Sequence, residues 1–114
     1  MIRRKDERRL EERPNIRGGD GVIHSNHLLE KEELLGKATL CTVFTLDPGC
    51  SIGYHAHDPE AEFFYILEGE LEANDNGTMT RLHPGDVMYT GDGATHSVRN
   101  DTDRPARMIA IILP

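Results

Sequence analysis

The stretch from residue 49 to residue 69, GCSIGYHAHDPEAEFFYILEG, decides the fold of this chain. It places His55 and His57 two positions apart, and a strand repeats every two residues, so both side chains should project from the same face. A turn signal at 58–60 then reverses the chain and brings Glu62 back beside the two histidines. The stretch therefore predicts two consecutive strands whose adjoining ends hold two imidazoles and one carboxylate.

A second stretch, residues 85–100 with the sequence GDVMYTGDGATHSVRN, carries another histidine, His96, on a strand far along the chain. A single His-x-His pair is more often two ordinary polar residues on a half-buried strand. Here the pair coincides with a glutamate, a remote histidine and the glycines at 49, 69, 85, 91 and 93, which favours a metal site. Three imidazoles and one carboxylate suit a first-row divalent ion. We expect one such ion per chain, bound by His55, His57, Glu62 and His96. The donor types do not choose among Mn, Fe, Ni, Co and Zn, and we take Mn or Fe first.

The two stretches resemble the two conserved motifs of the cupin superfamily, over roughly residues 38 to 113. The first matches at every defining position, and the second has Gly91 where the family usually has proline. Residues 15–21 and 27–29 are also similar to small single-domain cupins described as oxalate-decarboxylase-like. The resemblance implies an all-β fold, the double-stranded β-helix or jelly roll, with a metal inside one open end.

The remaining pattern agrees with many short strands separated by turns, which is typical of a sandwich or barrel. We predict strands at 22–29, 38–46, 62–67, 87–90, 95–100 and 107–113, a tight hairpin turn at 75–77, and one helical turn at 30–35 that ends at Gly36. Residues 1–21 are charged and then glycine-rich, so they form an N-terminal arm or edge strands. Residues 22–114 form the cupin barrel domain.

Charge and composition limit the classes of partner that this protein can bind. The net charge of −7 argues against nucleic acid and against anionic membrane surfaces. No run approaches the roughly 20 apolar residues that cross a bilayer, and the charged start lacks the apolar core of a signal peptide, so we expect a cytoplasmic protein. The apolar share of 37% is lean. Together with the arm, it favours a homodimer. Three Phe, three Tyr and no Trp favour a modest pocket for a small molecule. Cys41 should be a buried thiol and Cys50 an exposed one, without a disulfide.

Several residues are weaker candidates for the site. Side-chain alternation puts three apolar residues on the inward face with the metal ligands, as a pocket wall or simply as core: Phe64, Ile66 and Val98. A second acid near the metal, Asp58 or Glu60, can donate protons, although such turn acids are more often solvated. Arg17 can clamp a carboxylate or lie at the surface. The catalytic residues stay unassigned. His83 is expected at the surface. His24 and His27 can line a pocket mouth if residues 20–30 fold over it, but we expect them at the surface or at an interface.

Three functions from different classes remain open. The first is a metal-dependent enzyme acting on a small carboxylate, as the oxalate-decarboxylase resemblance implies. The second is another cupin enzyme, a sugar-derivative isomerase or a dioxygenase. The third is a non-catalytic module that binds a metal-chelated metabolite. Oxalate decarboxylases place an arginine three residues before the first histidine, where this chain has Ile52. We therefore expect that oxalate is not the preferred substrate, unless Arg17 reaches the pocket.

Overall fold

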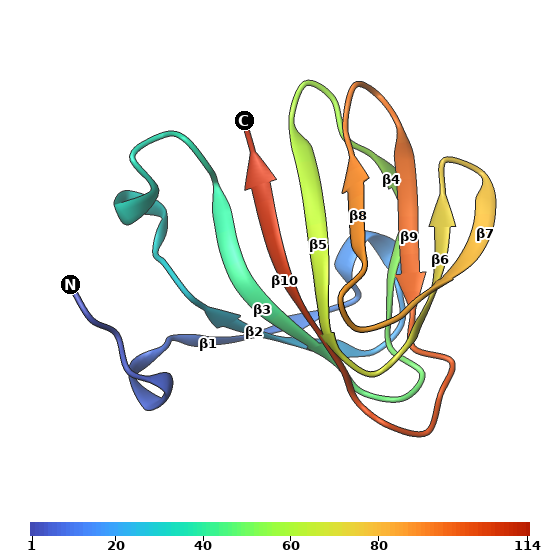
Figure 1. Cartoon of the computed structure of the whole chain (residues 1–114), viewed down its shortest axis with the longest axis horizontal. Coiled ribbons are helices and arrows are strands. Elements are labelled where there is room, and N and C mark those ends of the chain that lie inside the picture. Colours follow the sequence, from blue (N-terminus) through green and yellow to red (C-terminus); the bar gives the residue numbers. More distant parts are fainter.

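The structure, a computed structural model, describes residues 1–114 as two antiparallel β-sheets packed face to face (Figure 1). The six-stranded sheet has the order β1 (Leu10–Pro14), β2 (Val22–His27), β3 (Leu40–Leu46), β10 (Ala106–Leu113), β5 (Ala61–Glu68) and β8 (Val87–Thr90). The four-stranded sheet has the order β4 (Ser51–Ala56), β9 (Thr95–Arg99), β6 (Leu71–Asp75) and β7 (Thr78–Leu82). This is the double-stranded β-helix, so the predicted all-β fold is confirmed.

Helical structure is limited to three single 3₁₀ turns, η1 (Lys5–Glu7), η2 (Ile16–Gly18) and η3 (Lys31–Leu34). The turn predicted at 30–35 is η3. It begins with a reciprocal capping box between Glu30 and Glu33, in which each side chain accepts a hydrogen bond from the other residue's backbone N–H. Leu35 and Gly36 both take positive φ after it, which ends the helix. No helix is long and apolar enough to cross a membrane.

The predicted strands are present, with ends that differ by one or two residues. The turn predicted at 75–77 joins β6 to β7, and Asn76 and Gly77 take the positive φ values of 50° and 98° that such a tight hairpin requires. Thr78–Leu82, the returning strand β7, lacks alternating apolar residues and was not predicted. All side chains of β7 except that of Leu82 are exposed, so they bury little apolar surface. The strand is held mainly by its backbone pairing with β6.

The core lies between the sheets and follows the alternation of side chains along each strand. On β5 the inward positions are Glu62, Phe64 and Ile66, each at most 5% exposed. They pack with a cluster of buried residues from both sheets that includes Ile52 on β4 and Val98 on β9. Burial of one such large apolar side chain contributes about 1.5–3 kcal/mol to folding. The core therefore holds together the two sheets that carry the histidines.

The sequence left open whether residues 1–21 form an arm or edge strands. In the structure β1 pairs with β2 and forms the edge of the larger sheet. The Arg13 guanidinium lies over the Phe44 ring, with 5.9 Å from Cζ to the ring centroid. Glu11 accepts a hydrogen bond from Nε2 of His27 at 2.9 Å. His27 is 7% exposed, so the expected surface position is wrong: its side chain shares the inward face of β2 with Ile23 and Ser25. His83 is exposed, as expected.

The expected exposure of the two cysteines is also wrong, although both thiols are free. Cys50 is 8% exposed, because residues 19–22 lie against it and its Sγ faces the carbonyl oxygen of Val22 at 3.6 Å. Cys41 is partly exposed on the outer face of β3, and burial raises the pKa of its thiol. The N-terminal segment therefore buries the thiol that the local sequence placed in an exposed turn.

Candidate metal centre

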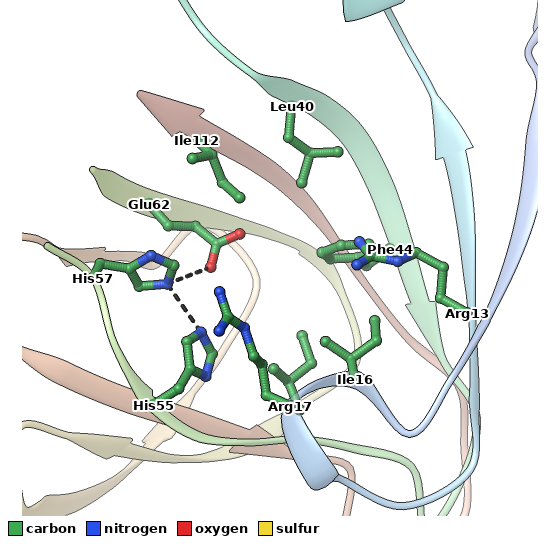
Figure 2. A pocket seen from close by; sticks show the side chains of 10 residues that line it. Arg13, Ile16, Arg17, Leu40, Phe44, His55, His57, Glu62 and Ile112 are labelled. Carbon is green, nitrogen blue, oxygen red and sulfur yellow. Dashed lines mark hydrogen bonds and ion pairs between the residues drawn. The ribbon is translucent and has the colours of Figure 1, made fainter. Parts of the chain in front are cut away.

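Three imidazoles and one carboxylate converge between the sheets. The Nε2 atoms of His55, His57 and His96 form a triangle with sides of 3.0, 3.1 and 3.1 Å. Oε1 of Glu62 lies 3.1 Å from Nε2 of His57 and 3.3 Å from Nε2 of His96. His57 and His96 are each 1% exposed, and Glu62 is 5% exposed. The structure thus brings together all four residues that the sequence proposed as metal ligands (Figure 2 shows three of them).

The Nδ1 atom of each histidine, which faces away from the cluster, contacts a polar group of the protein. Nδ1 of His55 donates to the carbonyl oxygen of Gly53 at 2.6 Å, and Nδ1 of His57 donates to Oε1 of Glu60 at 3.0 Å. Nδ1 of His96 lies 3.0 Å from the hydroxyl oxygen of Thr90. Contacts of this kind fix the ring orientation and the tautomer of metal-binding histidines. The sequence could not identify these partners.

The tautomers leave lone pairs at the centre of the cluster. A carbonyl and a carboxylate only accept hydrogen bonds, so Nδ1 carries the proton in His55 and in His57. In the neutral rings their Nε2 atoms therefore present lone pairs, and the 3.0 Å contact between these two Nε2 atoms is not a hydrogen bond. Burial lowers the pKa of His55, although the hydrogen bond to the Gly53 carbonyl acts in the opposite direction. The ring is therefore neutral at neutral pH. Lone pairs and a carboxylate that face one another repel, unless a cation lies between them.

The spacing of the donor atoms fits a six-coordinate ion. Ligands about 2.1 Å from a metal lie about 3.0 Å apart at adjacent corners of an octahedron, and about 3.4 Å apart in a tetrahedron. The three histidine nitrogens match the octahedral value. The Glu62 oxygen is beyond ion-pair distance from His55, although the four ligand atoms all lie within 4.8 Å of one another. That placement suits opposite corners, so the donor set fits a divalent metal.

Strands from both sheets place these ligands. The ladder between β4 and β9 shifts register between Ile52 and His55, which turns His55 inward opposite His96. His57 follows β4 and is fixed by backbone hydrogen bonds to the loop at 93–94. The Phe64 ring from β5 stacks on His96, with centroids 5.2 Å apart and an angle of 12° between the planes. The ligand cluster is therefore rigidly held by packing as well as by hydrogen bonds.

A cavity of about 70 Å³ opens beside His55, His57 and Glu62. Its other lining residues are five apolar residues and two arginines: Ile16, Leu40, Phe44, Ile52, Ile112, Arg13 and Arg17 (Figure 2). Pockets for drug-sized ligands measure about 300–1,000 Å³, so this one suits a ligand of a few heavy atoms. The cavity wall is largely apolar, and its charges other than Glu62 are two guanidinium groups.

Of the weaker candidates from the sequence, two charged residues lie at the cavity or at a ligand, and the three apolar residues lie in the core. Arg17 does reach the cavity, and Glu60 contacts the outer nitrogen of His57, while Asp58 is exposed. Phe64, Ile66 and Val98 lie in the core at 0–1% exposure, on the inward face as predicted, and other residues line the cavity.

The sequence analysis also missed residues around the cluster. Arg13 was missed because its strand, β1, carries no apolar alternation. No sequence pattern indicated that the carbonyl oxygen of Gly53 accepts the hydrogen bond from His55.

Comparison with known proteins agrees with this architecture. The cupin domain family model matches residues 42–112. An oxalate-binding protein of Thermotoga maritima is 39% identical over 113 residues, covering 99% of this chain and 93% of that protein. A Thermotoga maritima crystal structure, described as that of a predicted oxalate decarboxylase, has a TM-score of 0.93 at 39% identity, covering 99% of this chain and 98% of the other. The structure of KdgF from Halomonas shares the fold, with a TM-score of 0.80 at 16% identity, over 100% of this chain and 93% of that one.

The fold and the His/Glu cluster are those of a small β-barrel protein with a candidate metal centre. The match over residues 42–112 and the relative at 39% identity show its family: the chain belongs to the cupins.

Proposed function

We propose that this cupin is a metal-dependent binding protein for a small carboxylate, and that it holds the ligand without transferring protons to it. The single observation that carries the proposal is the convergence of three imidazole nitrogens and the Glu62 carboxylate beside a small cavity. A divalent ion bound there, Mn or Fe first, would supply a Lewis acid for oxygen ligands.

The donor geometry supports a chelating ligand. His55, His57, His96 and Glu62 would hold the ion, and a six-coordinate ion would keep two positions free for other ligands. Two oxygen atoms of one small molecule could then bind to it together. Oxalate offers two such oxygens, and a relative at 39% identity is an oxalate-binding protein. Oxalate is therefore the ligand to test first.

The cavity wall supports binding over catalysis. General acid–base catalysis needs a titratable group within reach of the substrate. Apart from the four proposed ligands, the lining residues with charge are Arg13 and Arg17, and an arginine stays protonated. Glu60 faces the outer nitrogen of His57 and does not line the cavity. We therefore favour the binding module over the decarboxylase and the isomerase, which both move protons; oxygen consumption by iron-loaded protein would identify the dioxygenase instead.

Calorimetric titration of oxalate tests the proposal when it is applied to metal-loaded and to metal-stripped protein. Formate production in the same samples distinguishes binding from decarboxylation.

The two free cysteines suit a reducing compartment, and we retain the cytoplasm as the proposed location.

We also propose that the chain forms a homodimer through the outer face of β5, β8 and β10. Tyr65 is paired with Val87 across one ladder and with Ile109 across the other, and Phe63 is paired with Tyr89. Tyr65, Val87 and Tyr89 are 40%, 61% and 62% exposed. Two copies that each carry a net charge of −7 repel each other, so a mostly apolar face, with Arg107 at one end of β10, is the surface through which they can meet.

Light scattering at micromolar concentration should give about twice the chain mass of 12.8 kDa. Replacing Val87 by glutamate should shift the protein to monomer, because it buries a charge in the apolar contact. Met79→Glu is the matched control, because Met79 is 56% exposed on the other sheet. A monomeric wild type, or a V87E variant that dimerises as well as M79E, contradicts this interface.

A further inference from the structure

Arg17 is a cation without an anionic partner in a chain that has an excess of acids. The chain has 20 acidic and 13 basic residues, and the guanidinium groups of Arg3, Arg9, Arg81 and Arg99 are each paired with a carboxylate. The Arg17 side chain makes no ion pair and no hydrogen bond. Instead it lines the cavity with His55 and Glu62, and Figure 2 shows its guanidinium pointing toward them.

The backbone of Arg17 is strained for a residue with a side chain. Its φ and ψ of 53° and 33° lie in the left-handed region, which glycine adopts readily and arginine does not. Glycines follow directly at positions 18 and 19. Glycine at position 17 would suit this backbone better, and the arginine side chain has no structural partner that compensates. Strain of this kind, at a residue that faces a site, points to a use for the side chain in binding.

The loop that carries Arg17 is locked onto the strand that carries His55. A Cβ on Gly53 would overlap the carbonyl oxygen of Arg17, and a Cβ on Gly19 would overlap the carbonyl oxygen of Ser51. The backbone N–H groups of Ser51 and Asp20 add hydrogen bonds at 2.9 Å, to the Asp20 carbonyl and to the Ser51 hydroxyl. Gly53 also accepts the hydrogen bond from His55. Gly53 thus contacts both Arg17 and His55, and the contacts of Gly19 and Asp20 with Ser51 fix the rest of the loop on the same strand.

We propose that Arg17 selects ligands that carry a second carboxylate, and that the η2 loop holds its guanidinium beside the metal centre for that purpose. The inference rests on the proposed metal-dependent binding. Ile52, at the position where the sequence comparison expected an arginine, is 3% exposed and offers no charge. A small dicarboxylate would chelate the metal through two oxygens and present its remaining oxygens to the Arg17 fork. Bidentate contacts of this kind are directional and strong.

Calorimetry with manganese-loaded protein tests the assignment with two ligands. Oxalate and glycolate both chelate a metal through two oxygens, but glycolate lacks the second carboxylate. In Arg17→Gly we expect oxalate affinity to fall about 10- to 100-fold, with a much smaller change for glycolate. Arg17→Lys should recover only part of the loss, because an ammonium cannot replace the fork. Arg104→Ala, which removes an exposed arginine without an acid partner, should change neither affinity by more than about twofold.

Metal content and thermal stability separate the possible outcomes. Arg17→Gly should keep one metal per chain and melt no lower than the wild type, since it relieves a left-handed residue. Unchanged oxalate affinity in this variant overturns the role of Arg17, as does an equal loss for oxalate and glycolate. A wild type that binds no metal overturns the proposed function instead, and this inference with it.

Discussion

Alanine at both His57 and His96 is expected to remove the bound metal and the stability that the metal confers. The wild type should retain about one divalent ion per chain, and the double variant close to none, because two of the four convergent donors are lost. A ligand present at 100 times its dissociation constant stabilises the fold by about 2.7 kcal/mol. Manganese should therefore raise the melting temperature of the wild type and leave that of the double variant unchanged. Elemental analysis and thermal melts measure both effects.

The matched control removes two imidazoles from elsewhere in the chain, at His24 and His83. That double alanine variant should keep its metal, because neither side chain reaches the cluster. Both cluster histidines are buried, so alanine leaves cavities. Glutamine at both positions fills more of that space and serves as the second variant. Metal content at wild-type level in either folded cluster variant contradicts the assignment.

Alanine in place of Phe64 is expected to destabilise the metal-free protein by about 3–5 kcal/mol. Phe64 is 0% exposed, and its ring stacks on His96 as well as packing in the core. The loss is large beside the roughly 5–15 kcal/mol that a domain of this size has in total. Urea denaturation of metal-free samples measures it without a contribution from metal binding.

The variant Met79→Ala provides the comparison for Phe64, because Met79 is 56% exposed on β7. Its unfolding free energy should change by no more than about 0.5 kcal/mol. Phe64→Leu should lie between the two, since it keeps most of the apolar volume. A change below about 1 kcal/mol for Phe64→Ala would mean that the ring is not part of the packing that holds His96.

Local patterns predicted the short strands, the turns and the shared position of His55, His57 and Glu62, whereas the jelly roll was what the resemblance to cupins implied. Alternation placed Glu62, Phe64 and Ile66 on one face, and the turns at 58–60 and 75–77 reversed the chain where expected. The His-x-His pair lay on one strand end, and the second motif supplied His96. The strands and turns need only the two-residue period of a strand and the chemistry of turn residues, whereas the place of His96 beside the other ligands rested on the two-part motif.

Contacts between distant segments were not predictable in the same way. Thr90 and Glu60 support the histidines through single hydrogen bonds, which have no sequence period. Arg17 reaches the cavity because Gly53 allows two backbones to approach closely, and one sequence does not show which backbones meet. His27 and Cys50 are buried by the N-terminal segment for the same reason.

The expectation that oxalate is not preferred relied on the absence of an arginine near the metal. The side chain of Arg17 now stands in the cavity, so that reason no longer holds.

Titration of oxalate into the same protein with and without its metal tests the central claim most directly. The protein is purified without chelators and without a histidine tag, and one portion is stripped of metal at the end. We predict one binding site per chain in the manganese-loaded sample, no measurable binding in the stripped sample, and no formate in either. Equal binding in both samples, or none in a fully loaded one, would contradict the proposal that this cupin binds a small carboxylate through a metal held by His55, His57, Glu62 and His96.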